Sequence, residues 1–178
     1  MMQILALAVA TAGSALAQNK EPQALPLPMG SGAATAAGSK GSEAAKATIP
    51  EIGCRDFRRR PVRVLEVPAL GDVGRAEFVG SGPVIKVDPD IMRRLPNGLQ
   101  AFFALHECGH HALGHLFAPT SESEKEADCW AMKEGVRRQD FAAADVAGWR
   151  PFFENSRGSA FHLPGPQRVT FLANCLSD

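Results

Sequence analysis

Residues 101–115 read AFFALHECGHHALGH, and this stretch decides the fold. It opens with apolar side chains on every side of the chain, which indicates a buried helix, and it continues into a half that is rich in histidine. We expect one long helix over residues 99–117, because Pro119 ends the pattern. Histidines at the end of a buried helix need polar partners, so this helix predicts both the core and a candidate site.

The centre of this helix, residues 106–110, reads HECGH. His106 and His110 lie one turn apart, about 40° from each other around the axis, so both imidazoles point the same way. Two imidazoles so placed can bind one Zn²⁺ at about 2.0–2.1 Å. Glu107 lies beside that face, where a carboxylate can take a proton from metal-bound water. The alternative, a surface helix that happens to hold histidine, is disfavoured by the apolar residues 101–105.

Two further histidines, His111 and His115, form a second pair with the same spacing. They point about 140° away from the first pair, and no glutamate lies between them. We interpret them as packing or surface residues. A catalytic zinc site needs a third protein ligand, which must therefore come from another segment.

The acidic segment at residues 121–128, SESEKEAD, offers that ligand. On a helix, Glu124, Ala127, Asp128 and Ala131 share one small and acidic face, which is suited to close approach toward another helix. We assign Glu124 as the third ligand and expect Asp128 to hold a ligating histidine by its other ring nitrogen. The alternative is that these acids only complement the helix dipole, which explains Glu122 but not Asp128, since Asp128 lies beyond the first turn.

Four cysteines lie in the same part of the chain: Cys54, Cys108, Cys129 and Cys175. In an exported chain they indicate two disulfides, and three pairings are possible. Cys54 and Cys175 lie near the two ends of the domain, so we expect a bridge between them that closes a long loop. Cys108 and Cys129 lie off the metal-facing helix faces, so neither is a good ligand.

The remaining patterns predict an α+β domain, in which a small sheet precedes several helices. A turn at residues 80–82, Gly-Ser-Gly, joins two of the strands. Thr120 or Ser121 can cap the helix that carries the acids, and Asp140 can cap the next one. We expect strands at 62–67, 77–79 and 83–87, helices at 90–95, 99–117, 120–138, 140–153 and 167–176, and a loop at 155–166.

The first residues of the chain carry a targeting pattern. Residues 1–17 hold no charge, contain an apolar stretch and end in Ala-Leu-Ala, so we expect a signal peptide that is removed near Gln18. The stretch is too short to span a bilayer, and no cysteine follows it, so no membrane anchor is expected. The alternative is an alanine-rich cytosolic N-terminus. Export places the protein in the periplasm or outside the cell.

Composition sets the rest of the domain plan. Residues 18–48 are dominated by Ala, Gly, Ser and Pro and hold no aromatic residue, so we expect a disordered linker before a folded domain at 49–178. The chain of 178 residues has a formal net charge of +0 and is 45% hydrophobic. This balance gives no general attraction to nucleic acid or anionic lipid, so neither is an expected partner.

Three blocks of the sequence together resemble the HtpX-type and CAAX-prenyl-endoprotease-type gluzincin zinc metallopeptidases. They are HExxH at 106–110, ExxxD at 124–128 and a His with an Arg six residues later at 162–168. The resemblance implies a minimal zincin-like domain. It also implies that His162 helps to stabilise the oxyanion and that Arg168 holds the site near Asp128 or His162. Residues 83–87 then form a strand at the cleft edge that can pair with an extended substrate.

We therefore expect a zinc-dependent peptidase of exported or envelope proteins, whose substrate is a peptide or protein. In this hypothesis Glu107 deprotonates a zinc-bound water and later protonates the leaving amine, while His162 and the metal stabilise the oxyanion. Two other classes stay open. One is a non-catalytic zinc-binding chaperone or adaptor module in the periplasm, and the other is an inert exported domain whose histidines and acids are structural.

Overall fold

The computed structural model describes residues 49–159 and 161–177, which form a mixed α and β structure. The predicted class, a small sheet followed by helices, is confirmed. The predicted signal peptide at 1–17 and linker at 18–48 lie outside the described residues. The elements are β1 (Arg63–Glu66), β2 (Gly74–Val79), β3 (Gly82–Val87), α1 (Pro89–Met92), α2 (Asn97–Ala112), α3 (Ser123–Arg138), η1 (Ala143–Trp149), α4 (Arg150–Phe153) and α5 (Gly165–Asn174).

The three strands form one sheet in the order β1-β3-β2. β2 and β3 are antiparallel and are joined at the predicted turn, where Gly80 has a φ of 62° that suits glycine. β1 runs parallel to β3. The expectation that residues 83–87 form a cleft-edge strand is wrong, because β3 is the central strand and its two neighbours use both of its edges. β2 begins at Gly74, before the predicted residue 77, and is an edge strand within the described part of the chain.

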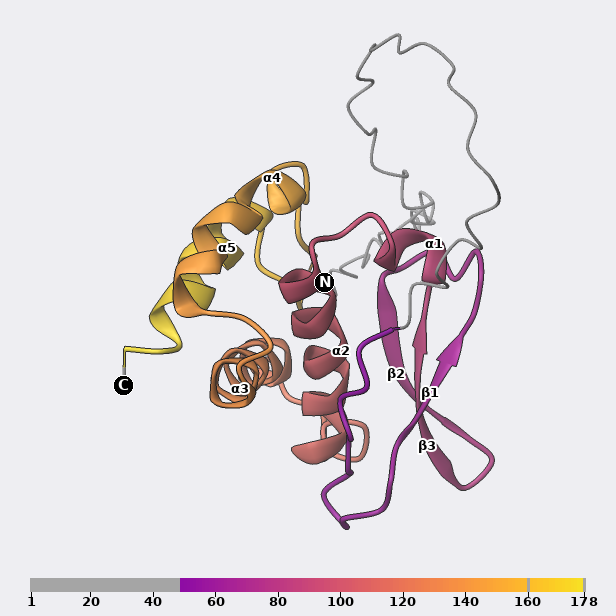
Figure 1. Ribbon diagram of the computed structural model, residues 1–178. Helices are drawn as coiled ribbons and strands as arrows, with labels where there is room; N and C mark the ends of the chain where they lie inside the picture. The colour runs from indigo at the N-terminus through magenta and orange to yellow at the C-terminus, as the bar shows by residue number, and fades with distance from the viewer. Residues whose placement is uncertain (1–48, 160, 178) are drawn as a thin grey trace, which may run out of the picture. The chain divides into compact units, whose positions relative to one another are not determined.

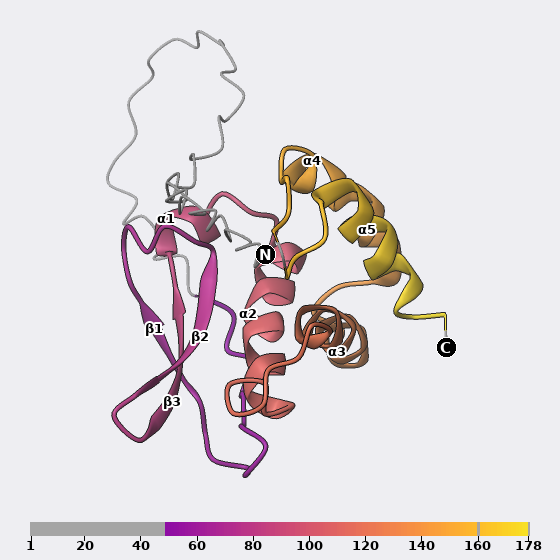
Figure 2. The same cartoon turned by 180° about the vertical axis from the view of Figure 1, so that it is seen from behind.

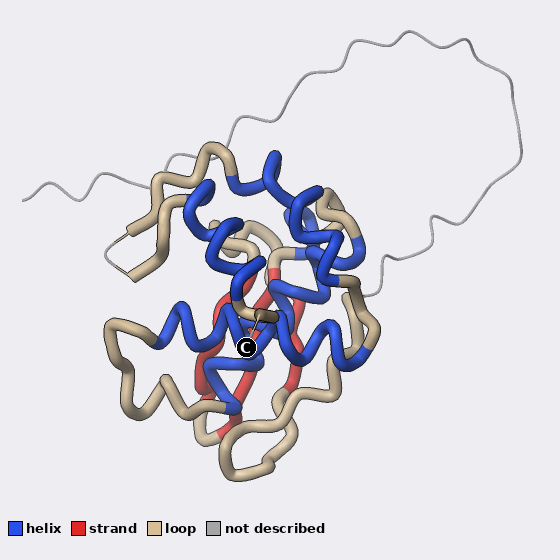
Figure 3. Tube along the Cα trace, turned by 90° about the vertical axis from the view of Figure 1, so that its left-hand side faces the viewer, coloured by secondary structure: helices blue, strands red, loops and turns tan. Residues whose placement is uncertain are grey.

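Helix α2 lies between the sheet on one side and α3, α4 and α5 on the other (Figures 1 and 2). Figure 3 shows the strands behind the helices, from a third direction. This central position explains why the apolar start of α2 is buried on both sides, with Leu99, Phe102 and Ala104 fully enclosed. Among the residues described, no helix combines the length and the apolar character that crossing a membrane requires.

The end of α2 differs from the prediction in a way that matters for the site. The helix stops at Ala112 because Gly114 adopts a φ of 79°. The N–H of Gly114 donates to the carbonyl of His111 (3.3 Å), and the N–H of His115 donates to the carbonyl of His110 (3.0 Å). These two bonds form a Schellman motif, which turns the chain back on the helix. His115 therefore leaves the helix, and the predicted helical pair of His111 and His115 is wrong.

Two predicted helix caps are also wrong. α3 begins only at Ser123, and the Thr120 hydroxyl accepts a hydrogen bond from the Glu122 N–H (3.2 Å) in the turn before it. Asp140 caps no helix, because its carboxylate pairs with Arg138. The expected single helix at 140–153 is instead the 3-10 helix η1 followed by the short α4, and α5 starts at Gly165 rather than residue 167.

Two disulfides are present, as predicted, but the expected Cys54–Cys175 pairing is wrong. Cys54 is bonded to Cys108 on α2, and Cys129 on α3 is bonded to Cys175 after α5. The sequence separations are 54 and 46 residues. In the chain-entropy account, each bridge then contributes about 4 kcal/mol.

Close packing of α2 against α3 brings the two predicted ligand segments together. A Cβ at Gly109 would lie 3.2 Å from the Ala127 Cα and 3.3 Å from its carbonyl oxygen. Ala127 and Ala131 are fully buried at this contact. Small residues on both helices therefore let the backbones approach, as the small face of the acidic segment predicts.

Candidate metal centre

Three side chains from α2 and α3 converge on one point. The Nε2 atoms of His106 and His110 lie 3.2 Å apart. Glu124 Oε2 lies 3.2 Å from His106 Nε2 and 3.5 Å from His110 Nε2. Ligands held at about 2.0–2.1 Å by a tetrahedral metal are separated from each other by about 3.3–3.4 Å. The triangle of donor atoms therefore has the size that zinc requires.

An unsatisfied polar atom lies at the centre of this cluster. Glu124 Oε2 is buried and makes no hydrogen bond of acceptable geometry among the described residues. A buried carboxylate oxygen without a partner is costly, and a cation would satisfy it. The donor set, two imidazoles and a carboxylate, is also the chemistry of a catalytic zinc site. The residues present fit a bound metal ion.

His162 approaches the same oxygen from the loop before α5. Its Nε2 lies 2.8 Å from Glu124 Oε2, and His106, Glu124 and His162 offer ligand atoms that all lie within 4.8 Å of one another. This group could hold a metal ion. A separation of 2.8 Å is shorter than the spacing of two ligands on one zinc, so we favour His110 as the third ligand and His162 as a neighbour of the site.

Behind His106 lies a buried charged pair. Asp128 Oδ1 is 2.8 Å from His106 Nδ1, and the Arg168 guanidinium contacts both oxygens of Asp128, at 2.9 and 2.6 Å. Burial lowers the pKa of His106, but the Asp128 and Glu124 carboxylates beside its two ring nitrogens outweigh burial and raise the pKa to about 9. Without a metal, His106 is therefore protonated at neutral pH, which again indicates that the cluster favours a cation.

Glu107 points from α2 toward the first residues of β2. A Cβ at Gly74 would lie 3.0 Å from the Glu107 Cγ, so the absence of a side chain at Gly74 makes room for this close approach. Burial raises the pKa of Glu107, although the charges of His106 and His110 act in the opposite direction. A raised pKa brings a carboxylate closer to the range in which it exchanges protons at neutral pH.

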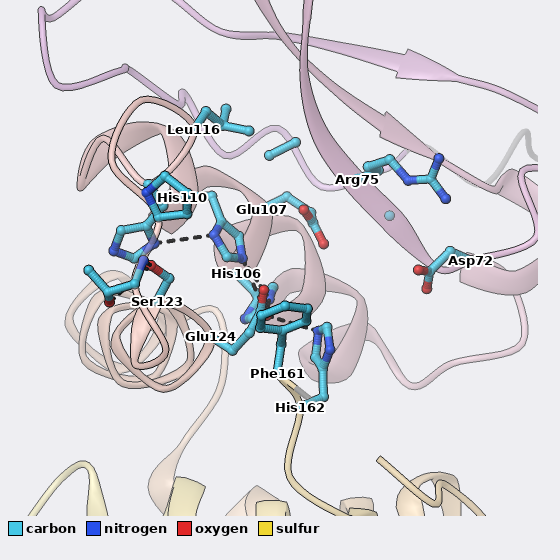
Figure 4. A pocket seen from close by; sticks show the side chains of 15 residues that line it. Asp72, Arg75, His106, Glu107, His110, Leu116, Ser123, Glu124, Phe161 and His162 are labelled. Carbon is cyan, nitrogen blue, oxygen red and sulfur yellow. Dashed lines mark hydrogen bonds and ion pairs between the residues drawn. The ribbon is translucent and has the colours of Figure 1, made fainter. Parts of the chain in front are cut away.

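These side chains line a cleft of about 400 Å³ (Figure 4). One wall is the start of β2 together with Asp72, and the other is the turn after α2 together with the loop that carries His162. Figure 4 shows Glu107 directed toward Arg75 and Asp72, and His162 meeting Glu124. The cleft is lined by Asp72, Gly74, Arg75, Ala76, His106, Glu107, His110, His115, Leu116, Pro119, Thr120, Ser123, Glu124, Phe161 and His162.

The structure thus places all seven predicted site residues in or directly behind this cleft. Sequence reasoning missed the wall formed by Gly74 and Ala76, because this wall depends on the strand order and no local pattern signals it. It also missed His115, whose return to the site follows from Gly114. A glycine after the last periodic residue is a known helix stop and could have revealed it.

Comparison with known proteins gives no further guide, since no family model, curated protein or solved structure matches this chain. The function is therefore argued from the geometry of the site.

Proposed function

We propose that the protein is a zinc-dependent peptidase that hydrolyses peptide bonds of exported or envelope proteins. The observation that carries the proposal is the convergence of His106, His110 and Glu124 at ligand spacing, with the Glu107 carboxylate beside them in an open cleft. A structural metal site would be closed by four protein ligands, whereas three ligands facing a cleft leave a position for water and substrate.

When bound, zinc would polarise the substrate carbonyl and lower the pKa of a water molecule. The Glu107 carboxylate would take a proton from the attacking water and deliver it to the leaving amine. The burial that raises the pKa of Glu107 favours the first of these steps, because a more basic carboxylate takes the proton more readily.

The His162 side chain supports the proposal from the opposite side of the cleft. It is partly exposed, and Ser159 Oγ lies 3.2 Å from its Nδ1. An imidazole held in this way can donate a hydrogen bond to an oxygen that becomes negatively charged during the reaction. We assign oxyanion stabilisation to His162, as the family resemblance of its sequence block implies. Arg168 acts through Asp128 and positions His106.

The substrate backbone is proposed to lie along β2 rather than along β3. β2 borders the cleft with Gly74, Arg75 and Ala76, and its outer edge is free within the described part of the chain. Backbone N–H and C=O groups at a free edge can pair with an extended peptide. This placement brings the scissile bond past Glu107.

The proposed location is the periplasm or the extracellular space. Two disulfides support it, because such bridges persist in oxidising compartments. The predicted signal peptide at 1–17 agrees with this location.

The test uses the full chain purified with both disulfides formed. It should bind one zinc ion and cleave casein, and a chelator should abolish cleavage. Glu107→Gln should bind zinc as the wild type does and lose activity by about 10²–10⁴-fold, because the isosteric amide cannot take the proton. Glu122→Gln makes the same change at an exposed carboxylate outside the cleft and should leave activity unchanged. Undiminished cleavage by Glu107→Gln would sink the proposed mechanism.

A further inference from the structure

A second chain of contacts leads away from His110. His115 Nδ1 lies 3.2 Å from His110 Nδ1, and His115 Nε2 lies 3.0 Å from Glu126 Oε2. His115 is 7% exposed and lines the cleft, whereas the Glu126 side chain is 55% exposed. Neither residue is needed for the mechanism above, so their alignment behind a metal-facing imidazole calls for an explanation.

Hydrogen-bond chemistry assigns the protons along this chain. The Glu126 carboxylate only accepts, so His115 Nε2 carries the proton that it donates. A neutral imidazole has a single N–H, and His115 Nδ1 must therefore accept the proton on His110 Nδ1. His110 Nε2 is then left with a free lone pair, and this is the atom that lies 3.5 Å from Glu124 Oε2.

We infer that His115, held by Glu126, is a positioning residue that fixes the tautomer and ring orientation of His110 for metal binding. The inference rests on the proposed zinc site but does not depend on peptidase activity. Metal-ligating histidines usually donate their other ring nitrogen to a carboxylate, carbonyl or water. Here a second imidazole takes that place, and the exposed carboxylate acts one step further out.

The backbone explains how His115 reaches this position. If α2 continued past Gly114, His115 would point about 140° away from the His110 direction, because it is five residues further on. The Schellman turn, with its bond from the His115 N–H to the His110 carbonyl, brings the two rings together instead. Their centroids are 5.2 Å apart, in an edge-to-face arrangement.

The experiment measures zinc affinity of the full chain by competition with a chelator. His115→Leu should weaken binding by about 10–100-fold, the usual effect of losing such a partner. His115→Gln should recover most of the loss, because the amide oxygen can accept from His110 and the amide nitrogen can donate to Glu126. Glu126→Ala should cause a smaller loss in the same direction, and Glu122→Ala, which removes a nearby exposed charge, should cause none.

A second readout follows the proton itself. In nitrogen-15 spectra of the zinc-loaded wild type, His110 should show a protonated Nδ1 protected from exchange, and this protection should disappear in His115→Leu. If His115→Leu does not fold, Glu126→Ala decides alone, since its side chain is largely exposed. Wild-type zinc affinity in both His115→Leu and Glu126→Ala would overturn the inference. Tight zinc binding without cleavage would overturn the proposed peptidase and leave the inference standing.

Discussion

The two histidines of the metal-facing pair are supported in opposite ways. His106 is backed by Asp128 and Arg168, all of them largely enclosed, with side-chain exposures of 4%, 5% and 12%. His110 is backed by the imidazole of His115 and then by the exposed carboxylate of Glu126. We call these two sets of contacts the His106 line and the His110 line. The His106 line buries the Asp128 carboxylate and balances it with the Arg168 guanidinium, whereas the His110 line ends in the Glu126 carboxylate, which stays in contact with water.

The difference shows that the orientation of an imidazole ring can be held by contacts that contribute very differently to the stability of the fold. Removing one member of a buried charged pair leaves the other charge in a medium that cannot solvate it, so the free energy of unfolding falls. Removing an exposed carboxylate changes little except the imidazole that it orients. Substitutions in the two lines should therefore differ in their effect on stability when stability and metal affinity are both measured.

The largest effect is expected from Asp128→Ala. The change leaves the Arg168 guanidinium buried without a partner, so the free energy of unfolding should fall by about 3–5 kcal/mol. Glu126→Ala, the matched change in the other line, should lower it by less than about 1 kcal/mol. Urea unfolding of the zinc-free proteins measures both. Equal losses in the two variants would contradict the contrast drawn between the lines.

A change of pH should act on the two lines in opposite directions. The pKa of His106 is raised from 6.5 to about 9, so its contribution to the stability of the zinc-free protein is complete below pH 6.5 and is lost as the pH rises to about 9. Burial lowers the pKa of His115, so its contribution is lost as the pH falls below 6.5. Thermal unfolding of the zinc-free protein between pH 5 and pH 9.5 measures both trends. Asp128→Asn should reduce the loss of stability between pH 6.5 and about 9, because it removes the charge that raises the pKa of His106.

A weaker effect, which acts on both His106 and His110, is expected from Gly109→Ala. The added methyl group would meet the Ala127 backbone at 3.2–3.3 Å, so α2 and α3 must move apart. Overpacking of this kind costs about 1–3 kcal/mol. Zinc affinity should fall as well, because the movement separates Glu124 from both imidazoles. An unchanged zinc affinity would show that the two helices can separate without disturbing the donors.

A smaller effect than that of Gly109→Ala is expected from Gly114→Ala, which changes only the surroundings of His110. A methyl group there meets Phe57 at an ordinary 3.7 Å, so the cost comes from the backbone at a φ of 79°. That cost is about 1–2 kcal/mol. The protection of the His110 Nδ1 proton should weaken, while the Asp128 contact with His106 should persist. Gly148→Ala, at a glycine with open space around it, provides the control.

Local patterns predicted the local structure of the chain. The Gly-Ser-Gly sequence predicted the hairpin, and the spacing of HECGH with the small acidic face of the next helix predicted which side chains converge. The order of the strands and the partners of Cys54 and Cys175 could not be predicted, because they depend on contacts between segments far apart in the chain. His115 was misplaced for a local reason, since periodicity was extended through Gly114.

The two disulfides have a consequence for where the protein can work. Each helix that supplies converging donors carries one bridged cysteine, Cys108 on α2 and Cys129 on α3. In a reducing cytosol both bridges would be absent, and the free energy of unfolding would be lower by about 4 kcal/mol for each. That sum is comparable with the entire stability of a small domain, about 5–15 kcal/mol. We therefore expect the donor cluster to assemble only once the four thiols have been oxidised.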